Sequence, residues 1–143
     1  MSKNTPDINV VLDDGAYAPE RAHMTDAGLD LKCMSDIDIP AGGSVVVDTG
    51  THIQLPEGTA GLLVSKSGLN VKHSITSTGL IDEGYTGPVK VKLYNHSSEP
   101  YHISEGSKIS QLIIIPVLYS KVNIVDHLDE TERGDAGFGS TGK

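Results

Sequence analysis

The stretch TGLIDEGYTG, residues 78–87, gathers side chains that could do chemistry. Its glycines, Gly79, Gly84 and Gly87, allow a tight hairpin whose backbone approaches a ligand closely. Asp82 follows two apolar residues, so we expect its carboxylate at the mouth of a partly dry site, where it could take a proton from water. A hairpin whose acids simply face solvent has the same pattern, and spacing alone leaves both interpretations open.

Two shorter stretches could bind an anion. SKSGL, residues 65–69, could form a nest of backbone N–H groups, with further donors from Lys66 and Ser67. In ISQLI, residues 109–113, Gln111 interrupts an otherwise apolar strand, and a polar side chain there either pairs with backbone or points into a site. Neither signal is specific by itself, and pairing with backbone is the commoner outcome for such a glutamine.

The C-terminal stretch RGDAGFGSTGK, residues 133–143, carries Phe138, the single Phe of a chain without Trp. A segment of Gly, Ser and Thr offers this ring no core. GFGSTGK matches the spacing of a phosphate-binding P-loop, but that motif needs a strand before it and a helix after it. No residue follows Lys143 in this sequence, so we do not expect a P-loop.

Short segments rich in Val, Ile and Thr alternate with Gly and Pro turns along most of the chain, which predicts an all-β sandwich, jelly roll or barrel. A short helix is possible within 65–72. The composition becomes polar and Gly-rich near Asp126, so we expect a β-domain over 1–126 and a mobile C-terminal arm over 127–143. The expected strands are 8–12, 29–33, 36–40, 43–56, 60–66, 71–75, 88–95, 100–104, 108–118 and 121–125.

Charge and composition narrow the partners. The net charge is −8 and the pI is about 5.0, so most of the surface should repel duplex nucleic acid, and a bound anion would need a local basic pocket or a metal ion. Cys33 is the single cysteine, which fits a reducing cytoplasm. The longest apolar run, residues 112–118, is too short to span a bilayer, and we expect neither signal peptide nor membrane anchor.

Five segments in order resemble the motifs of the homotrimeric dUTP pyrophosphatases (dUTPases). They are AGLDL (27–31), SKSGL (65–69), GLIDEGYTG (79–87), GSKISQLI (106–113) and RGDAGFGSTG (133–142). The resemblance implies a jelly-roll-like fold and a homotrimer with three active sites, each built from all three chains. One chain would supply the first, second and fourth motifs, another the hairpin, and the third the arm.

The resemblance also implies a reaction: dUTP and water give dUMP and pyrophosphate, which keeps uracil out of DNA and supplies dUMP for thymidylate synthesis. Asp82 would orient and deprotonate the water that attacks the α-phosphorus, and would meet the 3′-hydroxyl. Tyr85 would lie beneath the deoxyribose and leave no room for a 2′-hydroxyl. Backbone groups of the hairpin would bind uracil, at Gly79, Leu80, Ile81 and Lys90.

The same resemblance assigns the phosphates and the lid. Mg²⁺ would bridge the three phosphates and keep most of its waters. Asp30 would act near the metal through water or support the site, with a purely structural carboxylate as the open alternative. The α- and β-phosphates would be held by Lys66, Ser67, Gly68 and Gln111. The arm would close with Phe138 on the uracil face, Arg133 on the γ-phosphate, and Gly139, Ser140 and Thr141 as further donors.

Three residues depart from the family pattern. Lys66 and Lys108 stand where the second and fourth motifs usually carry Arg, which replaces a planar fork by a point charge. Thr76 stands where some members use Asn near the base. Two alternatives remain: a dCTP deaminase-like enzyme, which would need a Glu where Lys92 stands, and a non-catalytic jelly-roll module.

Overall fold

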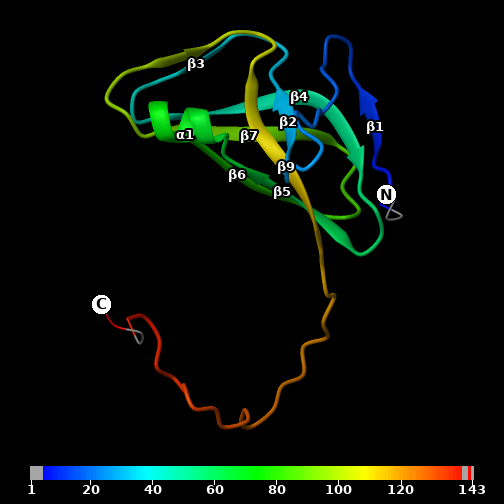
Figure 1. Cartoon of the computed structure of the whole chain (residues 1–143), viewed down its shortest axis with the longest axis vertical. Coiled ribbons are helices and arrows are strands. Elements are labelled where there is room, and N and C mark those ends of the chain that lie inside the picture. Colours follow the sequence, from blue (N-terminus) through cyan, green and yellow to red (C-terminus); the bar gives the residue numbers. More distant parts are fainter. Residues whose placement is uncertain (1–4, 140–141, 143) are drawn as a thin grey trace.

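The computed structural model describes residues 5–139 and 142, and the regular elements within them are β-strands and one short helix (Figure 1). One antiparallel sheet has the strand order β1-β4-β7-β6-β5-β9-β2, and β3 pairs with β8 in a small second sheet. The elements are β1 (Asn9–Leu12), β2 (Leu29–Lys32), β3 (Ile37–Ile39), β4 (Ser44–Gln54), β5 (Thr59–Val64), α1 (Ser67–His73), β6 (Ile75–Ile81), β7 (Pro88–Asn95), β8 (Tyr101–Ile103) and β9 (Lys108–Pro116).

The core follows from alternation along the strands. In β7, Val89, Val91 and Leu93 are buried while the residues between them are more exposed, as expected for a strand with one face on a core. The long segment expected over 43–56 is a single strand, β4, whose pairing with β7 shifts register between Asp48 and His52. The all-β prediction is confirmed.

The helix expected within 65–72 is present as α1, but the strand expected over 71–75 is wrong. Residues 71–73 belong to α1, and β6 begins only at Ile75. Ser74 ends the helix in the left-handed region with φ 59°, and its N–H donates to the carbonyl of Asn70. Alternation over five residues is too short to exclude a helical turn.

The strand expected over 121–125 is also wrong. The chain has no regular element after β9 among the described residues, and it runs away from the body of the domain (Figure 1). Val122 and Ile124, whose spacing suggested a strand, are 91% and 93% exposed and lack a neighbouring strand in the described part of the chain. The predicted boundary at residue 126 stays a prediction. No helix in residues 5–139 and 142 combines the length and apolarity needed to cross a membrane.

Candidate active site

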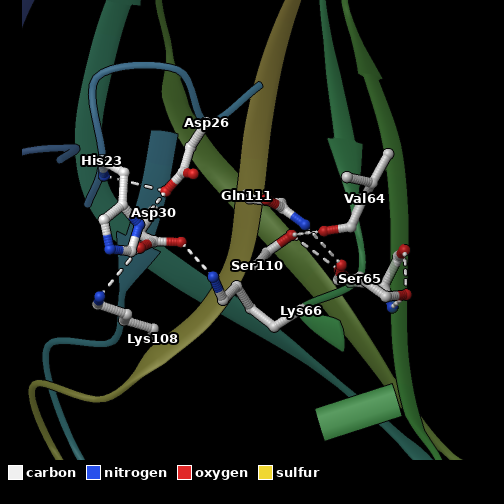
Figure 2. Close-up of polar contacts among 10 residues, drawn as sticks. His23, Asp26, Asp30, Val64, Ser65, Lys66, Lys108, Ser110 and Gln111 are labelled. Carbon is white, nitrogen blue, oxygen red and sulfur yellow. Dashed lines mark hydrogen bonds and ion pairs between the residues drawn. The ribbon is translucent and has the colours of Figure 1, made fainter. Parts of the chain in front are cut away.

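A buried ion network occupies the edge of the sheet where β2 meets β9. Asp30, on β2, is 3% exposed and lies opposite Gln111 in the register. Lys66 Nζ lies 2.5 Å from one carboxylate oxygen and Lys108 Nζ lies 3.0 Å from the other, as Figure 2 shows. The two lysines in the arginine positions therefore act together on one carboxylate. Each ammonium has three N–H donors, so donors remain for an anion.

The pKa of Asp30 reflects this pairing. Burial by itself raises the pKa of the carboxyl, but hydrogen bonds and charges from Lys66 and Lys108 outweigh burial and hold the pKa below its ordinary value of 3.8. The bond to Asp30 in turn raises the pKa of Lys108. The lowered pKa of Asp30 and the raised pKa of Lys108 both favour the charged forms of these two groups near neutral pH.

We expect Asp30→Asn to lower the free energy of unfolding at pH 7 by about 1.5–3 kcal/mol, because an amide cannot accept a charge-assisted bond from both lysines. A depressed pKa contributes stability above the ordinary pKa, and this contribution is lost as pH falls through the lower folded value. The difference from wild type should therefore shrink below pH 3.8. Urea unfolding at equal protein concentration measures it. Asp14→Asn, at an exposed position, is the control, and an equal loss there would contradict the prediction.

Gln111 is satisfied by backbone and still faces this cluster. Its amide Nε2 donates to the carbonyl of Ser65 over 3.0 Å, which leaves a second amide hydrogen for a ligand. Its other amide atom, Oε1, packs over Gly28, where an added Cβ would lie only 2.4 Å away. Gly28 was not among the predicted site residues, although the segment AGLDL contains it. Its role appears only once β2 and β9 are paired.

Buried hydroxyl groups hold the end of β5 beside β6. Ser65 accepts from the N–H of Ser77 at 2.9 Å, and Ser77 and Ser110 share a hydrogen bond of 2.8 Å. Ser110 also donates to the carbonyl of Val64 (Figure 2). These contacts, which the sequence did not reveal, set the path of the chain into α1. Ser67 and Gly68 follow there on the exposed surface, and space around Gly68 is open.

The hairpin between β6 and β7 is splayed apart. The two strands pair only at the end away from the turn, from Ile75↔Asn95 to Ser77↔Leu93. Beyond it, Thr78–Ile81 pair with β5 and Pro88–Lys92 pair with β4. The edges of 79–81 and 88–91 that face one another therefore form no ladder in the structure. Backbone groups of the residues predicted to bind uracil are left available.

The turn of this hairpin carries Asp82 and Tyr85. The N–H of Tyr85 donates to the carbonyl of Asp82, and its hydroxyl donates to the carbonyl of Pro88 at 2.9 Å. Asp82 is exposed, at the edge of a cavity of about 480 Å³ whose walls include Leu80, Ile115 and Tyr119. This placement combines the two sequence interpretations: the acid meets solvent and also borders an apolar hollow.

Glu83, beside Asp82, fixes the turn. Its Oε1 accepts from the N–H of Gly58 at 2.6 Å and from the hydroxyl of Tyr119 at 2.8 Å. The Tyr119 hydrogen bond is the largest cause that lowers the pKa of Glu83. Tyr119 lies just after β9, so this contact ties the start of the C-terminal segment to the hairpin. Sequence reasoning did not assign this role to Glu83.

The remaining predicted residues lie apart. Thr76 shares a 2.7 Å hydrogen bond with His96 Nε2, at the end of the hairpin away from its turn. Lys90 lies on β7 opposite Asp48. Phe138 is fully exposed, and Arg133 Nε donates to the carbonyl of Ala136 within the same segment. Gly139 is described and exposed, whereas Ser140 and Thr141 lie outside the described residues.

One chain does not bring these groups together. Ser65 is bonded to Ser77, so the adjacent Lys66 lies beside the start of β6, whereas Asp82 follows its end. Thr76 and Asp82 are six residues apart, which at the rise of a strand is about 20 Å. Lys66 of the ion network and the hairpin turn thus lie at opposite ends of one strand. The C-terminal segment after β9 runs away from the body of the domain (Figure 1).

A sequence model of the dUTPase family matches residues 14–142, which includes the ion network, the hairpin and the C-terminal segment. The chain belongs to the dUTPase family. It is 44% identical over 134 residues to the deoxyuridine 5′-triphosphate nucleotidohydrolase of Gloeothece citriformis and 47% identical over 134 residues to that of Clostridium acetobutylicum. Each alignment covers 92% of both chains.

Solved structures of dUTPases share the fold. A mutant of Staphylococcus bacteriophage 80alpha dUTPase with dUpNHpp has a TM-score of 0.89 and 29% identity, covering 97% of this chain and all of that one. A mutant dUTPase from phage phi11 of S. aureus, described with a structural Mg(II) ion, has a TM-score of 0.80 and 28% identity, covering 85% and 98% of the two chains. The expected jelly-roll-like dUTPase fold is confirmed, and neither a deaminase nor a non-catalytic module explains these matches.

Proposed function

We propose that this dUTPase-family enzyme hydrolyses dUTP to dUMP and pyrophosphate. The observation that carries the proposal is the family match over 14–142, which contains Asp82, Gln111 and Phe138 in their expected order. The dUpNHpp in the phage 80alpha relative supports a deoxyuridine triphosphate as the ligand class. By the same inference the enzyme keeps uracil out of DNA and supplies dUMP, acts in the cytoplasm, and forms no stable complex with nucleic acid.

We infer that the active protein is a homotrimer with shared sites. The support is that Lys66 lies beside the start of β6, whereas Asp82 lies about 20 Å along the strand from Thr76, a gap that a neighbouring chain's hairpin would close. Apolar side chains on the outer face of the sheet offer a subunit contact: Leu62 lies between Leu80 and Ile113 in the register, and Leu80 is 66% exposed. A trimer would cover this face.

In the proposed reaction Asp82 is the general base. Its carboxylate takes a proton from a water whose oxygen attacks the α-phosphorus, while the bond to the bridging oxygen of the β-phosphate breaks and pyrophosphate leaves. Tyr85 would lie beneath the deoxyribose and exclude a 2′-hydroxyl. Unpaired backbone groups at Gly79, Leu80, Ile81 and Lys90 would bind the uracil edge. Thr76, already bonded to His96, would lie beside the base.

The phosphate side would come from the Asp30 network. Lys66, Ser67, Gly68 and Gln111 would donate to the α- and β-phosphates, and Asp30 would hold Lys66 in place. The described residues contain no cluster of three or more acidic, His or Cys side chains that could hold a metal ion. This fits Mg²⁺, which usually keeps several waters and binds through substrate phosphates and few carboxylates. When bound, Mg²⁺ would neutralise the charge on the triphosphate.

The C-terminal arm would complete the site. Phe138 would stack on uracil, Arg133 would contact the γ-phosphate, and Gly139 would add a backbone donor. Ser140 and Thr141 belong to the same proposal although they lie outside the described residues. The exposure of Phe138 in the structure supports this role, because a fully exposed ring gains contact area only from a ligand or another chain.

A substrate panel tests the function. Pyrophosphate release is measured with Mg²⁺ and each of dUTP, dCTP, dTTP and UTP. We expect turnover of dUTP only. The amino group of cytosine would leave a backbone donor of the hairpin unmatched, which costs about 1–3 kcal/mol. A narrow hairpin cleft would exclude the 5-methyl of dTTP, and Tyr85 would exclude the 2′-hydroxyl of UTP. Formation of a deoxyuridine nucleotide from dCTP would instead support the deaminase. No turnover of dUTP would refute the proposal.

A further inference from the structure

His52 connects the hairpin turn to the opposite edge of the sheet. It lies on β4 opposite Pro88, and its ring Nδ1 is 2.9 Å from the carbonyl oxygen of Thr86. Its Nε2 is 3.1 Å from a carboxylate oxygen of Asp13, which follows β1 and donates its own N–H to the carbonyl of Gly50. His52, Asp13 and Thr86 line one cavity of about 480 Å³, which is distinct from the cavity that Asp82 borders.

Both ring nitrogens of His52 face acceptors. A peptide carbonyl only accepts, and an ionised carboxylate only accepts, whereas a neutral imidazole carries a single N–H. The imidazolium form alone makes both bonds at once. When the ring loses its proton, the one remaining N–H bonds the ionised carboxylate of Asp13, the stronger acceptor, and the contact with the Thr86 carbonyl is the one that is lost.

The carbonyl that His52 holds belongs to the turn that places Tyr85. The Thr86 carbonyl begins the peptide that leads into Gly87, and a Cβ on Gly87 would lie 2.6 Å from the Tyr85 hydroxyl oxygen. Tyr85 therefore rests directly on Gly87, with its hydroxyl on Pro88. Movement of the Thr86–Gly87 peptide would move the surface beneath the ring.

We propose that His52, held by Asp13, is a positioning residue that fixes the Tyr85 turn for nucleotide binding, and that it does so fully only as an imidazolium. This inference rests on the proposed function for the role of Tyr85 in binding. It leaves the chemistry of Asp82 unchanged, so it predicts an effect on KM for dUTP and not on kcat.

The charges around the ring favour this form. The hydrogen bond to Thr86 is the largest cause that raises the pKa of His52 above its ordinary value of 6.5, burial opposes it, and the charges of Asp13 and Asp48 add to it. Asp48 lies on the same strand and is paired with Lys90 on β7. A raised pKa means that the contribution is complete below 6.5 and is lost as pH rises through the folded value.

Two isosteric variants separate the two contacts. His52→Asn keeps a donor at the position of Nδ1 and so keeps the Thr86 bond at every pH, whereas His52→Gln keeps a donor near Nε2 for Asp13 and loses Thr86. We expect KM of the wild type to rise about five- to tenfold as pH increases through the His52 pKa. KM of His52→Asn should stay low across that range, and KM of His52→Gln should stay high.

A second readout does not need catalysis. In NMR spectra of the unliganded protein, the backbone amides of Thr86 and Gly87 should titrate with the His52 ring in wild type and stop titrating in His52→Asn. His102 is the matched control, since it also bonds an aspartate, Asp38, at 2.7 Å but lies on β8. His102→Asn should keep the wild-type pH dependence.

Amide signals that ignore the titration of His52, or a KM profile in His52→Asn equal to that of the wild type, would overturn the inference. Failure of the protein to hydrolyse dUTP would refute the proposed function and the binding role together. The amide titration would then still decide whether His52 fixes the turn.

Discussion

Asp82→Asn should lower kcat for dUTP by about 10²–10⁴-fold, the usual contribution of a positioned general base. The amide has almost the same shape and still orients water, but it cannot take the proton. Asp82 accepts no side-chain hydrogen bond from the described part of the chain, so the substitution should leave folding and assembly unchanged. Steady-state pyrophosphate release at saturating dUTP measures the effect.

A binding measurement distinguishes loss of the chemical step in Asp82→Asn from loss of its structure. Calorimetric affinity for dUpNHpp should be nearly the same in Asp82→Asn and wild type, since the base acts in the transition state. Asp14→Asn makes the same change of charge at an exposed position and should keep full activity. An Asp82→Asn enzyme with wild-type kcat would exclude Asp82 as the base and leave the hairpin only a binding role.

Removal of residues 133–143 should reduce kcat/KM for dUTP by about 100-fold or more. The lost terms are the stacking of Phe138, about 1–3 kcal/mol, and charge-assisted bonds from Arg133, about 1.5–3 kcal/mol. The body should fold as before, because Arg133 bonds to Ala136 inside the removed stretch, and Gly134 bonds to Thr131, which lies just before it and outside every strand. Thermal unfolding and kinetics of the truncated protein measure both quantities.

Single substitutions identify the ring as the cause. Phe138→Ala should lose most of the stacking contribution, whereas Phe138→Tyr keeps an aromatic face and should retain most activity. Full activity after truncation would contradict the lid. A large loss of thermal stability would instead assign these residues to the body of the domain.

Local patterns in the sequence were sufficient for most strands. Alternation in β7 placed Val89, Val91 and Leu93 correctly, because one face of that strand packs on the core. The same reasoning was wrong at 71–75, where a left-handed Ser74 ends a helix, and at 121–125, where apolar residues lie exposed. A short alternating pattern does not state whether a partner strand exists.

The residues of the ion network stood out in the sequence, but their contacts with one another did not. Asp30, Lys66 and Lys108 were each singled out, yet their joining into one ion network depends on pairing of β2 with β9 and on the turn after β5. Gly28 and His52 gave no signal of their own, because their partners, Gln111 and Thr86, are distant in sequence. Pairing of distant strands creates these roles.

The separation of the two halves of the site has a simple origin. Strand β6 starts beside Lys66 of the Asp30 ion network, and Asp82 follows its end. At the rise of a strand, the six residues from Thr76 to Asp82 span about 20 Å. We therefore expect a site that needs both ends to take them from different chains, and an active monomer would contradict this expectation.

Mixing two inactive variants tests this claim most directly. The first variant, Asp82→Asn, lacks the proposed base. The second is a double variant, Lys66→Ala with Gln111→Ala, which lacks the proposed phosphate contacts. The two proteins are mixed in equal amounts, unfolded together and refolded. If sites are shared and chains assemble at random, about half of the hairpins and about half of the Lys66–Gln111 phosphate contacts are intact. About a quarter of the sites then combine both, so about a quarter of wild-type turnover should return. Turnover no greater than the sum of the separately refolded variants, with mixed trimers shown to be present, would contradict shared sites.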